Sequence, residues 1–261
     1  MHETSMDRLY LHSPFRNWPP LGKLVLSLAL ILATLFTNSP AVPLVVLAIG
    51  TILFSLSSKF YLPRIFLFAY IDTLLVILIG ALIIALVTPG STLLSAELGP
   101  LTLSLTREGM NLGVLVFLRA VADLSILLFF ASSTSIPHFF TALRQVGLPA
   151  SISELAVLIY RYSFLLADQV ELMITAAQCR LGFKGLRNSI RTISIITACV
   201  FSRSMDLAER GQYALYCRNF QGSFPSFKTP PKMTAVWVIV PIAIFFILYY
   251  LGYLTSGWLV L

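Results

Sequence analysis

Two arginines in the C-terminal half of the chain lie in closely matched sequences, 38 residues apart. The first segment reads Ala-Ala-Gln-Cys-Arg and the second Ala-Leu-Tyr-Cys-Arg, and each follows a long stretch with helical periodicity. The last turn of a helix carries free carbonyls and a partial negative charge, so a cation is favoured there. An arginine fixed at such a helix end is a good donor for a carboxylate on a partner. The residues that define these two tips are Ala176, Arg180 and Gly182 in the first copy and Ala214, Arg218 and Asn219 in the second.

Gly182 and Asn219 are assigned a helix C-cap role, because both residue types readily adopt the left-handed conformation that often ends a helix. The small Ala176 and Ala214, one turn before each arginine, leave room for a neighbour to approach. The alternative interpretation is a plain C-terminal cap with a solvated arginine. The matched spacing favours a docking function.

Other groups that could carry chemistry are scattered along the chain. Its three cysteines, Cys179, Cys199 and Cys217, form no C-x-x-C pair, and its three histidines lie far apart in the sequence. The phosphate-binding pattern G-x-x-x-x-G-K-[ST] does not occur. The sequence therefore predicts no catalytic residue, no metal site and no cofactor on this chain.

The composition excludes an ordinary soluble enzyme and a disordered protein. Apolar residues make up 57% and charged residues 11% of the 261 residues, and the mean hydropathy is +0.88. Soluble domains carry about 25% charged residues, so this chain is typical of an integral membrane protein. The net charge of +7 then indicates the cytoplasmic excess of Lys and Arg rather than nucleic-acid binding.

Five apolar runs predict transmembrane helices, since a bilayer core needs about 17–25 apolar residues per helix. Four lie in an N-terminal membrane part, residues 1–131, at 21–37, 41–57, 65–87 and 108–131. The fifth, 234–254, lies in the C-terminal part, residues 233–261. The first run lacks a small-x-small cleavage site, so we expect a retained helix and not a signal peptide. Residues 88–107 are expected to form a loop with few charges.

Residues 132–232 form a different region, with eleven basic and five acidic residues, which the positive-inside rule places in the cytoplasm. Alternation of the spans then puts the N-terminus inside and the C-terminus outside. The region predicts a short helix and two long ones. We expect the first long helix to begin at a Ser151 or Ser153 cap and end near Gly182. We expect the second to begin at an Asn188 or Ser189 cap and end near Asn219.

Each long helix spans about 30 residues, or about 45 Å, so antiparallel helices would hold the two arginines far apart. That arrangement suits two copies of one partner. The predicted fold is an all-α integral membrane protein with about five transmembrane helices plus long cytoplasmic coupling helices.

Three charged residues fall inside the apolar runs: Asp72, Arg119 and Asp123. Charges within a membrane segment are functional candidates by default. Arg119 and Asp123 are four residues apart, so we expect a structural ion pair inside the bundle. Gly109 and Gly113 form a G-x-x-x-G motif, which either faces a partner subunit or packs within the chain.

The chain resembles the transmembrane (T) subunit of energy-coupling factor (ECF) transporters, in the cobalt and nickel branch (the CbiQ/NikQ family). The resemblance covers most of the sequence. It includes Gly22-Lys23-Leu24, Leu118-Arg119-Ala120, Ser132-Ser133-Thr134, Gly147-Leu148-Pro149, Tyr160-Arg161-Tyr162 and the two arginine tips. The family carries two short Ala-Arg-Gly-like motifs on crossed cytoplasmic helices, and each docks on one ATPase subunit. Here Cys179 and Cys217 stand where Ala is usual, and Leu181 and Asn219 where Gly is common.

The resemblance implies a non-catalytic coupling subunit of an ATP-driven importer for cobalt or nickel ions in a prokaryotic cell (inner) membrane. It implies as partners two ATPase subunits, which hold ATP and Mg, and a substrate-binding membrane (S) subunit, with or without a small accessory membrane subunit. The bilayer surrounds the chain, and no nucleic acid is implied. The alternatives are a T subunit shared by vitamin-specific modules, a secondary transporter with its own substrate site, and a membrane scaffold whose basic helices bind anionic lipid.

Overall fold

Apolar helices form the larger of the two units into which the chain divides. The computed structural model describes residues 13–58, 64–89, 92–98, 101–220, 231 and 233–255, with side chains from 13–57, 70–89, 106–220, 231 and 233–255. One unit, here called the membrane unit, comprises the chain up to Ser135 together with Pro230–Leu261. The other, here called the hairpin unit, comprises Ile136–Thr229. Each unit is described by itself below.

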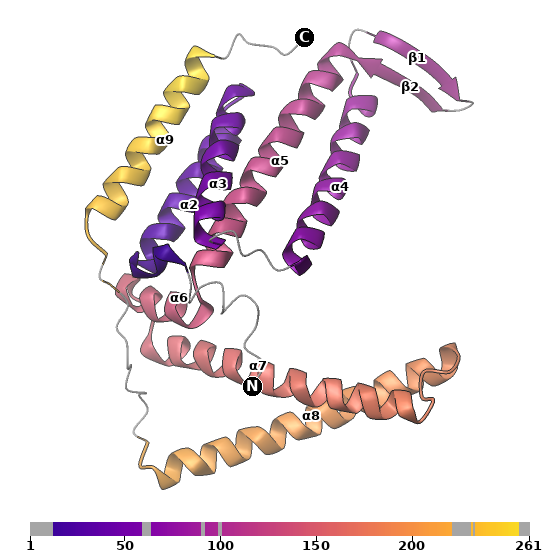
Figure 1. The fold of residues 1–261 in the computed structure, drawn as a ribbon, viewed down its shortest axis with the longest axis vertical. Helices are drawn as coiled ribbons and strands as arrows, with labels where there is room; N and C mark the ends of the chain where they lie inside the picture. The colour runs from indigo at the N-terminus through magenta and orange to yellow at the C-terminus, as the bar shows by residue number, and fades with distance from the viewer. Residues whose placement is uncertain are drawn as a thin grey trace. The chain divides into compact units, whose positions relative to one another are not determined.

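Five apolar helices within the described residues build the membrane unit (Figure 1). They are α2 (Pro20–Phe36), α3 (Ala41–Ser58), α4 (Arg64–Val87), α5 (Arg107–Ser133) and α9 (Val236–Leu254), and a short 3₁₀ turn, η1 (Pro14–Asn17), precedes them. The helices agree with the five predicted runs to within two residues at each end. The all-α membrane class is thus confirmed.

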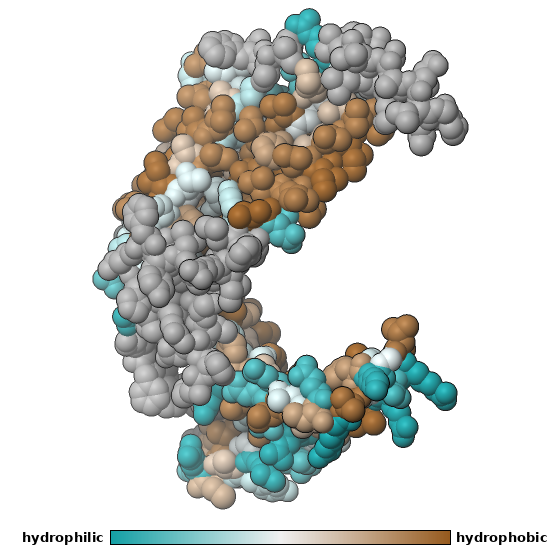
Figure 2. Space-filling model, turned by 45° about the vertical axis from the view of Figure 1, so that its right-hand side comes forward, coloured by the Kyte–Doolittle hydropathy of each residue, from teal (hydrophilic) through white to brown (hydrophobic). Residues whose placement is uncertain are grey.

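Length and composition qualify four helices within the described residues as membrane spans: the Tyr70–Val87 stretch of α4, α5, α9 and α7 (Ala150–Cys179). Mean hydropathy is 2.2 to 2.6 in the first three but only 1.3 in α7. The helices α2 and α3 are apolar but shorter, as their sequence runs predicted. Figure 2 shows apolar side chains covering much of the membrane unit, while hydrophilic residues gather over α7 and α8 (Leu186–Cys217).

Glycines at both ends of the α2–α9 contact show that these two helices run in the same direction. A Cβ on Gly22, at the start of α2, would lie 2.8 Å from the Trp237 ring at the start of α9. A Cβ on Gly252, near the end of α9, would lie 2.1 Å from the methyl carbon of Thr37, just after α2. Both positions therefore require glycine for close packing. Since α2 and α9 are the first and last of the five apolar helices, a chain that crosses the membrane at each of them would run through α2 and α9 in the same direction.

The G-x-x-x-G motif packs within the chain. A Cβ on Gly109 would lie 2.6 Å from the carbonyl oxygen of Ala85, and one on Gly113 would lie 2.9 Å from that of Ala81. Small residues thus let α4 and α5 approach closely and in antiparallel fashion. Of the two interpretations left open for this motif, internal packing is the one observed.

The core of the membrane unit lies among α2, α3, α5 and α9. Its fully buried residues are Leu30, Ala33, Val42, Val46, Ala122, Ile126 and Leu248. The helix α4 contributes none of these residues, since within the described residues it packs chiefly on α5 and next to strand β2. Most large side chains in the Tyr70–Val87 stretch of α4 are therefore exposed in the isolated chain.

The predicted 88–107 loop is wrong in detail, because its centre is a β-hairpin. Strands β1 (Thr92–Leu98) and β2 (Leu101–Thr106) pair antiparallel, with Ser95 opposite Ser104 and Leu98 opposite Leu101. The sequence Leu-Thr-Leu-Ser-Leu-Thr alternates apolar and polar residues with the period of a strand. That alternation was the signal for the hairpin.

The hairpin unit contains α6 (Ile136–Leu143), the 3₁₀ turn η2 (Arg144–Val146), α7 and α8. The predicted side-chain caps of the two long helices are wrong. Pro149 and Gly185 occupy the N-cap positions, and neither cap residue provides a side-chain hydrogen bond. Ser153 instead donates to the carbonyl of Phe140 at 3.0 Å, which ties the start of α7 to α6.

Asn188 and Ser189, the predicted caps of α8, lie inside the helix, and both donate back to carbonyls near its start. Asn188 bonds Lys184 at 3.1 Å, and Ser189 bonds Gly185 at 2.9 Å. Pro149 and Gly185 show that these two helices begin without a capping side chain, so the capping preference of serine and asparagine predicted the wrong cap residues.

Candidate functional site

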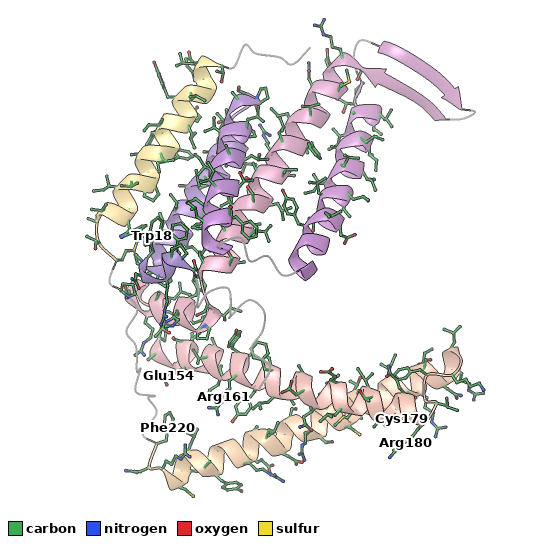
Figure 3. All side chains as sticks on the ribbon, in the orientation of Figure 1. Trp18, Glu154, Arg161, Cys179, Arg180 and Phe220 are labelled. Carbon is green, nitrogen blue, oxygen red and sulfur yellow. The ribbon has the colours of Figure 1, made fainter. Side chains whose placement is uncertain are left out.

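The helices α7 and α8 form an antiparallel hairpin that places the two arginine tips at opposite ends. Arg180 follows α7 at the turn into α8, whereas Arg218 follows the far end of α8. Figure 3 labels Arg180 at one end of the hairpin and Phe220, two residues after Arg218, at the other. A 32-residue helix is about 48 Å long at 1.5 Å per residue, so the tips are separated by about that length.

The two helices touch closely at a few points and leave apolar grooves beside them. A Cβ on Gly211 of α8 would lie 2.6 Å from the Tyr162 hydroxyl of α7, so glycine lets the tyrosine approach. One groove, with a volume of about 470 Å³, lies between Leu158 and Leu166 of α7 and Leu207 of α8. A second, of about 490 Å³, lies nearer the α7–α8 turn.

The first tip is a Schellman motif. The Leu181 N–H donates to the Gln178 carbonyl at 3.0 Å, and the Gly182 N–H donates to the Ala177 carbonyl at 2.9 Å. Leu181 has φ 56°, in the left-handed region. This pair of bonds satisfies carbonyls that the end of a helix leaves free.

The second tip has the same geometry. The Asn219 N–H donates to the Tyr216 carbonyl at 3.0 Å, the Phe220 N–H donates to the Leu215 carbonyl at 3.0 Å, and Asn219 has φ 52°. Arg180 and Arg218 are both C-cap residues, with φ/ψ of −93°/13° and −94°/12°. The two arginines therefore leave their helices in matching backbone conformations.

The sequence prediction for the left-handed residue is right for Asn219 but wrong for Gly182. Leu181 takes that position in the first tip, directly after the arginine, as Asn219 does in the second. Gly182 is needed for space instead, because a Cβ there would lie 2.9 Å from the Thr192 hydroxyl oxygen. Thr192 also donates to the Gly182 carbonyl at 2.7 Å, which fastens the tip to α8.

Both arginine side chains are exposed and have no ion-pair partner among the described residues. The one salt bridge between described residues joins Arg144 and Glu154 at 4.0 Å, and both residues belong to the hairpin unit. Ala176 and Ala214 are exposed one turn before the arginines. Each tip therefore has an exposed arginine and, one turn earlier, an exposed alanine.

Large apolar side chains are exposed around each arginine. Leu181 and Leu186 are 68% and 85% exposed at the first tip, and Tyr213 and Tyr216 are each 67% exposed at the second. Exposed apolar groups rimmed by charge mark surfaces that bind other proteins, and arginine and tyrosine are enriched where such binding is strongest. Both tips thus combine a charged donor with an apolar contact area.

The charged residues within the membrane unit make different contacts from those predicted. Arg119 on α5 donates to the carbonyl of Thr37, which follows the last residue of α2, and to the Asn38 side chain at 3.2 Å. Asp123 accepts a 2.7 Å bond from Thr34. The predicted direct Arg119–Asp123 ion pair is wrong, because each side chain reaches α2 instead.

Sequence reasoning missed the buried Lys23 as a structural residue. Its side chain is 1% exposed, and its ammonium donates to the Ser133 carbonyl, the last of α5, at 2.5 Å. A cation is favoured at that carbonyl end. Nearby, the hydroxyls of Ser13, Ser57 and Ser132 form a buried chain with two 3.1 Å contacts. The motif Gly22-Lys23-Leu24 was the available signal.

Asp72, the third charged residue of the apolar runs, is exposed on α4. The cysteines Cys179, Cys199 and Cys217 are free and exposed. The described residues contain no group of three or more His, Cys, Asp or Glu side chains that could hold a metal ion. His2 and His12, two of the three histidines of the chain, lie outside the described residues.

Comparison with known proteins places the chain in a family. The CbiQ family, described as cobalt transport protein, matches residues 12–231. A cobalt transport protein CbiQ of Rhodobacter capsulatus is 30% identical over 232 residues, which cover 88% of this chain and 90% of that protein. An uncharacterised protein of Methanocaldococcus jannaschii is 26% identical, over 98% of this chain and 95% of its own length.

A putative fused cobalt transport protein CbiMQ of Methanocorpusculum labreanum is 25% identical over 84% of this chain, and the match spans 37% of that longer protein. The family match, which covers most of the chain, agrees with the multi-pass apolar helices and with the resemblance found in the sequence. The chain therefore belongs to the CbiQ family and is a membrane component of cobalt transport.

Proposed function

We propose that this chain is the coupling (T) subunit of an ATP-driven, ECF-type importer of cobalt ions. Two ATPase subunits dock on the hairpin unit, one at each arginine tip. Their closure on ATP and opening after hydrolysis move α7 and α8. The membrane unit passes that motion to a separate substrate-binding subunit, which releases the ion.

The observation that carries the proposal is the repeated tip geometry. Two Schellman motifs of the same form each present an exposed arginine, at opposite ends of one antiparallel hairpin. One helix end with an arginine is an ordinary cap. Two matched ends suit a partner that is present twice, with one carboxylate-bearing groove for each guanidinium.

The proposal places the hairpin unit in the cytoplasm of a prokaryotic cell, beneath the inner membrane. Support comes from the eleven basic against five acidic residues of 132–232 and from the mean hydropathy of α7, which is 1.3 against 2.2 to 2.6 in α4, α5 and α9. With five alternating spans, the N-terminus is then cytoplasmic and the C-terminus external. ATP and Mg belong to the ATPase partners, and no cofactor is assigned to this chain.

The transported ion is proposed to bind on a second membrane subunit, with or without a small accessory subunit. The fused relative supports this, since the match to this chain covers 37% of a longer protein that is named as a fused CbiMQ. The family supports cobalt as the substrate. Nickel is the alternative for a closely related importer, and uptake competition between the two ions distinguishes them.

Charge reversal at both tips tests the proposal. We expect the Arg180→Glu/Arg218→Glu variant to lose ATPase binding and cobalt uptake, because a carboxylate replaces each donor that faces a partner carboxylate. The matched control is Arg191→Glu/Arg203→Glu, which changes the net charge equally at exposed positions within α8. Full cobalt uptake by the double-tip variant would overturn the assignment.

A further inference from the structure

One face of α4 carries a carboxylate that points away from the rest of its own bundle. Ala81 and Ala85 form the inner side of the helix, where their carbonyls lie against Gly109 and Gly113 of α5. Asp72 precedes Ala81 by nine residues, or about two and a half turns, which puts it on the opposite side. Its side chain is exposed, in agreement with that geometry.

Arg107 and Glu108 are exposed too, but they are the first two residues of α5, and Asp72 differs from the charged side chains deeper within the described helices. Lys23 is buried against Ser133, Arg119 reaches the end of α2, and Asp123 accepts from Thr34. Asp72 has no hydrogen bond or ion pair with any described residue. Charged residues inside membrane segments almost always face the bundle interior or a water-filled cavity and pair with another polar group, so an outward aspartate is a candidate for pairing with another chain.

The depth of Asp72 strengthens this argument. It lies eight residues after Arg64, the first residue of α4, or about 12 Å along the helix axis. The hydrocarbon core is about 30 Å thick and the 24-residue α4 is about 36 Å long, so a core centred on α4 would begin about 3 Å after Arg64 and would enclose the carboxylate. A lysine or arginine stem could carry its charge to the interface, but the short aspartate side chain cannot.

The surface around Asp72 has the shape and composition of a helix-docking face. Leu75, Val76, Ile79 and Ile83 share its side of α4, and each is 48% to 62% exposed. On the flank of this face, a Cβ on Gly80 would meet no atom within 4 Å, so a neighbouring helix could approach the backbone closely. The exposed sides of α3 and α9 are apolar too, but no Asp, Glu, Lys or Arg lies in either helix, so lipid suits them.

We propose that the Asp72 face of α4 binds a transmembrane helix of the substrate-binding subunit, and that this helix presents a lysine or arginine at the depth of Asp72. The identity of the partner rests on the proposed function, whereas the face itself is assigned from Asp72 and its surroundings. Charge complementarity selects this occupant over lipid. A second copy of this chain is disfavoured, because its own Asp72 would bring a like charge.

Replacement of Asp72 by leucine separates docking from folding. Asp72→Leu makes α4 more apolar, so the chain should insert into the membrane at least as well as the wild type. We expect the purified complex to keep its ATPase subunits. It should retain about tenfold less substrate-binding subunit, because the substitution removes one desolvated charge pair between helices. Thr51→Leu is the matched control, since it replaces an exposed polar residue on α3.

Photo-crosslinking then identifies the occupant. A benzophenone amino acid at Ile79 should form an adduct with the substrate-binding subunit, while one at Ile247, which is 63% exposed on α9, should not. Two results, obtained while the ATPases remain bound, would overturn the inference. One is full retention of the substrate-binding subunit by Asp72→Leu. The other is an Ile79 adduct formed only with lipid or with a second copy of this chain. A wild-type chain that holds neither ATPase nor substrate-binding subunit would overturn the proposed function as well.

Discussion

Leu181 provides a quantitative test of the tip geometry. It has φ 56°, where the Cβ of an ordinary residue crowds the following carbonyl at a cost of about 1–2 kcal/mol. Asparagine tolerates this region and occupies the equivalent position, Asn219, in the second tip. We therefore expect Leu181→Asn to stabilise the first tip by about 1 kcal/mol and Asn219→Leu to destabilise the second by about the same amount.

Hydrogen exchange of backbone amides measures both effects locally. An energy of 1 kcal/mol corresponds to about a fivefold change in the opening equilibrium. The Leu181→Asn variant should slow exchange of the residue 181 and Gly182 amides, which bond to Gln178 and Ala177, by about that factor. Asn219→Leu should accelerate exchange of the residue 219 and Phe220 amides correspondingly.

The matched control is Leu172→Asn, at a helical position of α7 with 65% exposure against 68% for Leu181. There the same substitution should destabilise the helix by about half a kcal/mol, because asparagine is a poorer helix former than leucine. Faster exchange at the first tip in Leu181→Asn, as at the control position, would refute the left-handed assignment of Leu181.

Two further predictions concern packing within the membrane unit. Gly252→Ala should lower the midpoint of thermal unfolding in detergent, because the new methyl group would overlap Thr37, and the free energy of unfolding should fall by about 1–3 kcal/mol. Gly80→Ala is the control, since its new methyl group meets no atom within 4 Å, and it should leave the midpoint unchanged or raised. Arg119→Met should cost about 1–3 kcal/mol by leaving the Thr37 carbonyl without its donor, whereas Asp123→Asn keeps an acceptor for Thr34 and should cost less. Equal losses for these two variants would instead support a direct Arg119–Asp123 pair.

The spans and the two tips could be predicted from the sequence because their signals are local. An apolar run of membrane length specifies a helix without knowledge of its neighbours, and the repeat around Arg180 and Arg218 is visible as residue identity. The left-handed residue of the first tip was misplaced because glycine is the usual choice there. Gly182 instead packs against Thr192 of α8, a long-range contact that residue types do not reveal.

Long-range contacts account for the remaining differences. The spacing of four residues on one helix predicted an Arg119–Asp123 pair. Instead, Arg119 donates to the Thr37 carbonyl at the end of α2, and Asp123 accepts from the Thr34 hydroxyl. The motif Gly22-Lys23-Leu24 draws attention to Lys23, but it does not identify the carbonyl 110 residues away that Lys23 bonds. The orientation of Asp72 also depends on a long-range contact, because the packing of Ala81 and Ala85 against α5 defines which side of α4 faces outward.

The number of ATPase subunits held by each variant tests the central claim most directly. Native mass spectrometry of the detergent-solubilised complex should show two ATPase subunits on the wild-type chain and none on Arg180→Glu/Arg218→Glu. The single variants Arg180→Glu and Arg218→Glu should each show complexes with one ATPase subunit, because each tip is proposed to hold its own copy. Two ATPase subunits retained on the double variant would contradict the account.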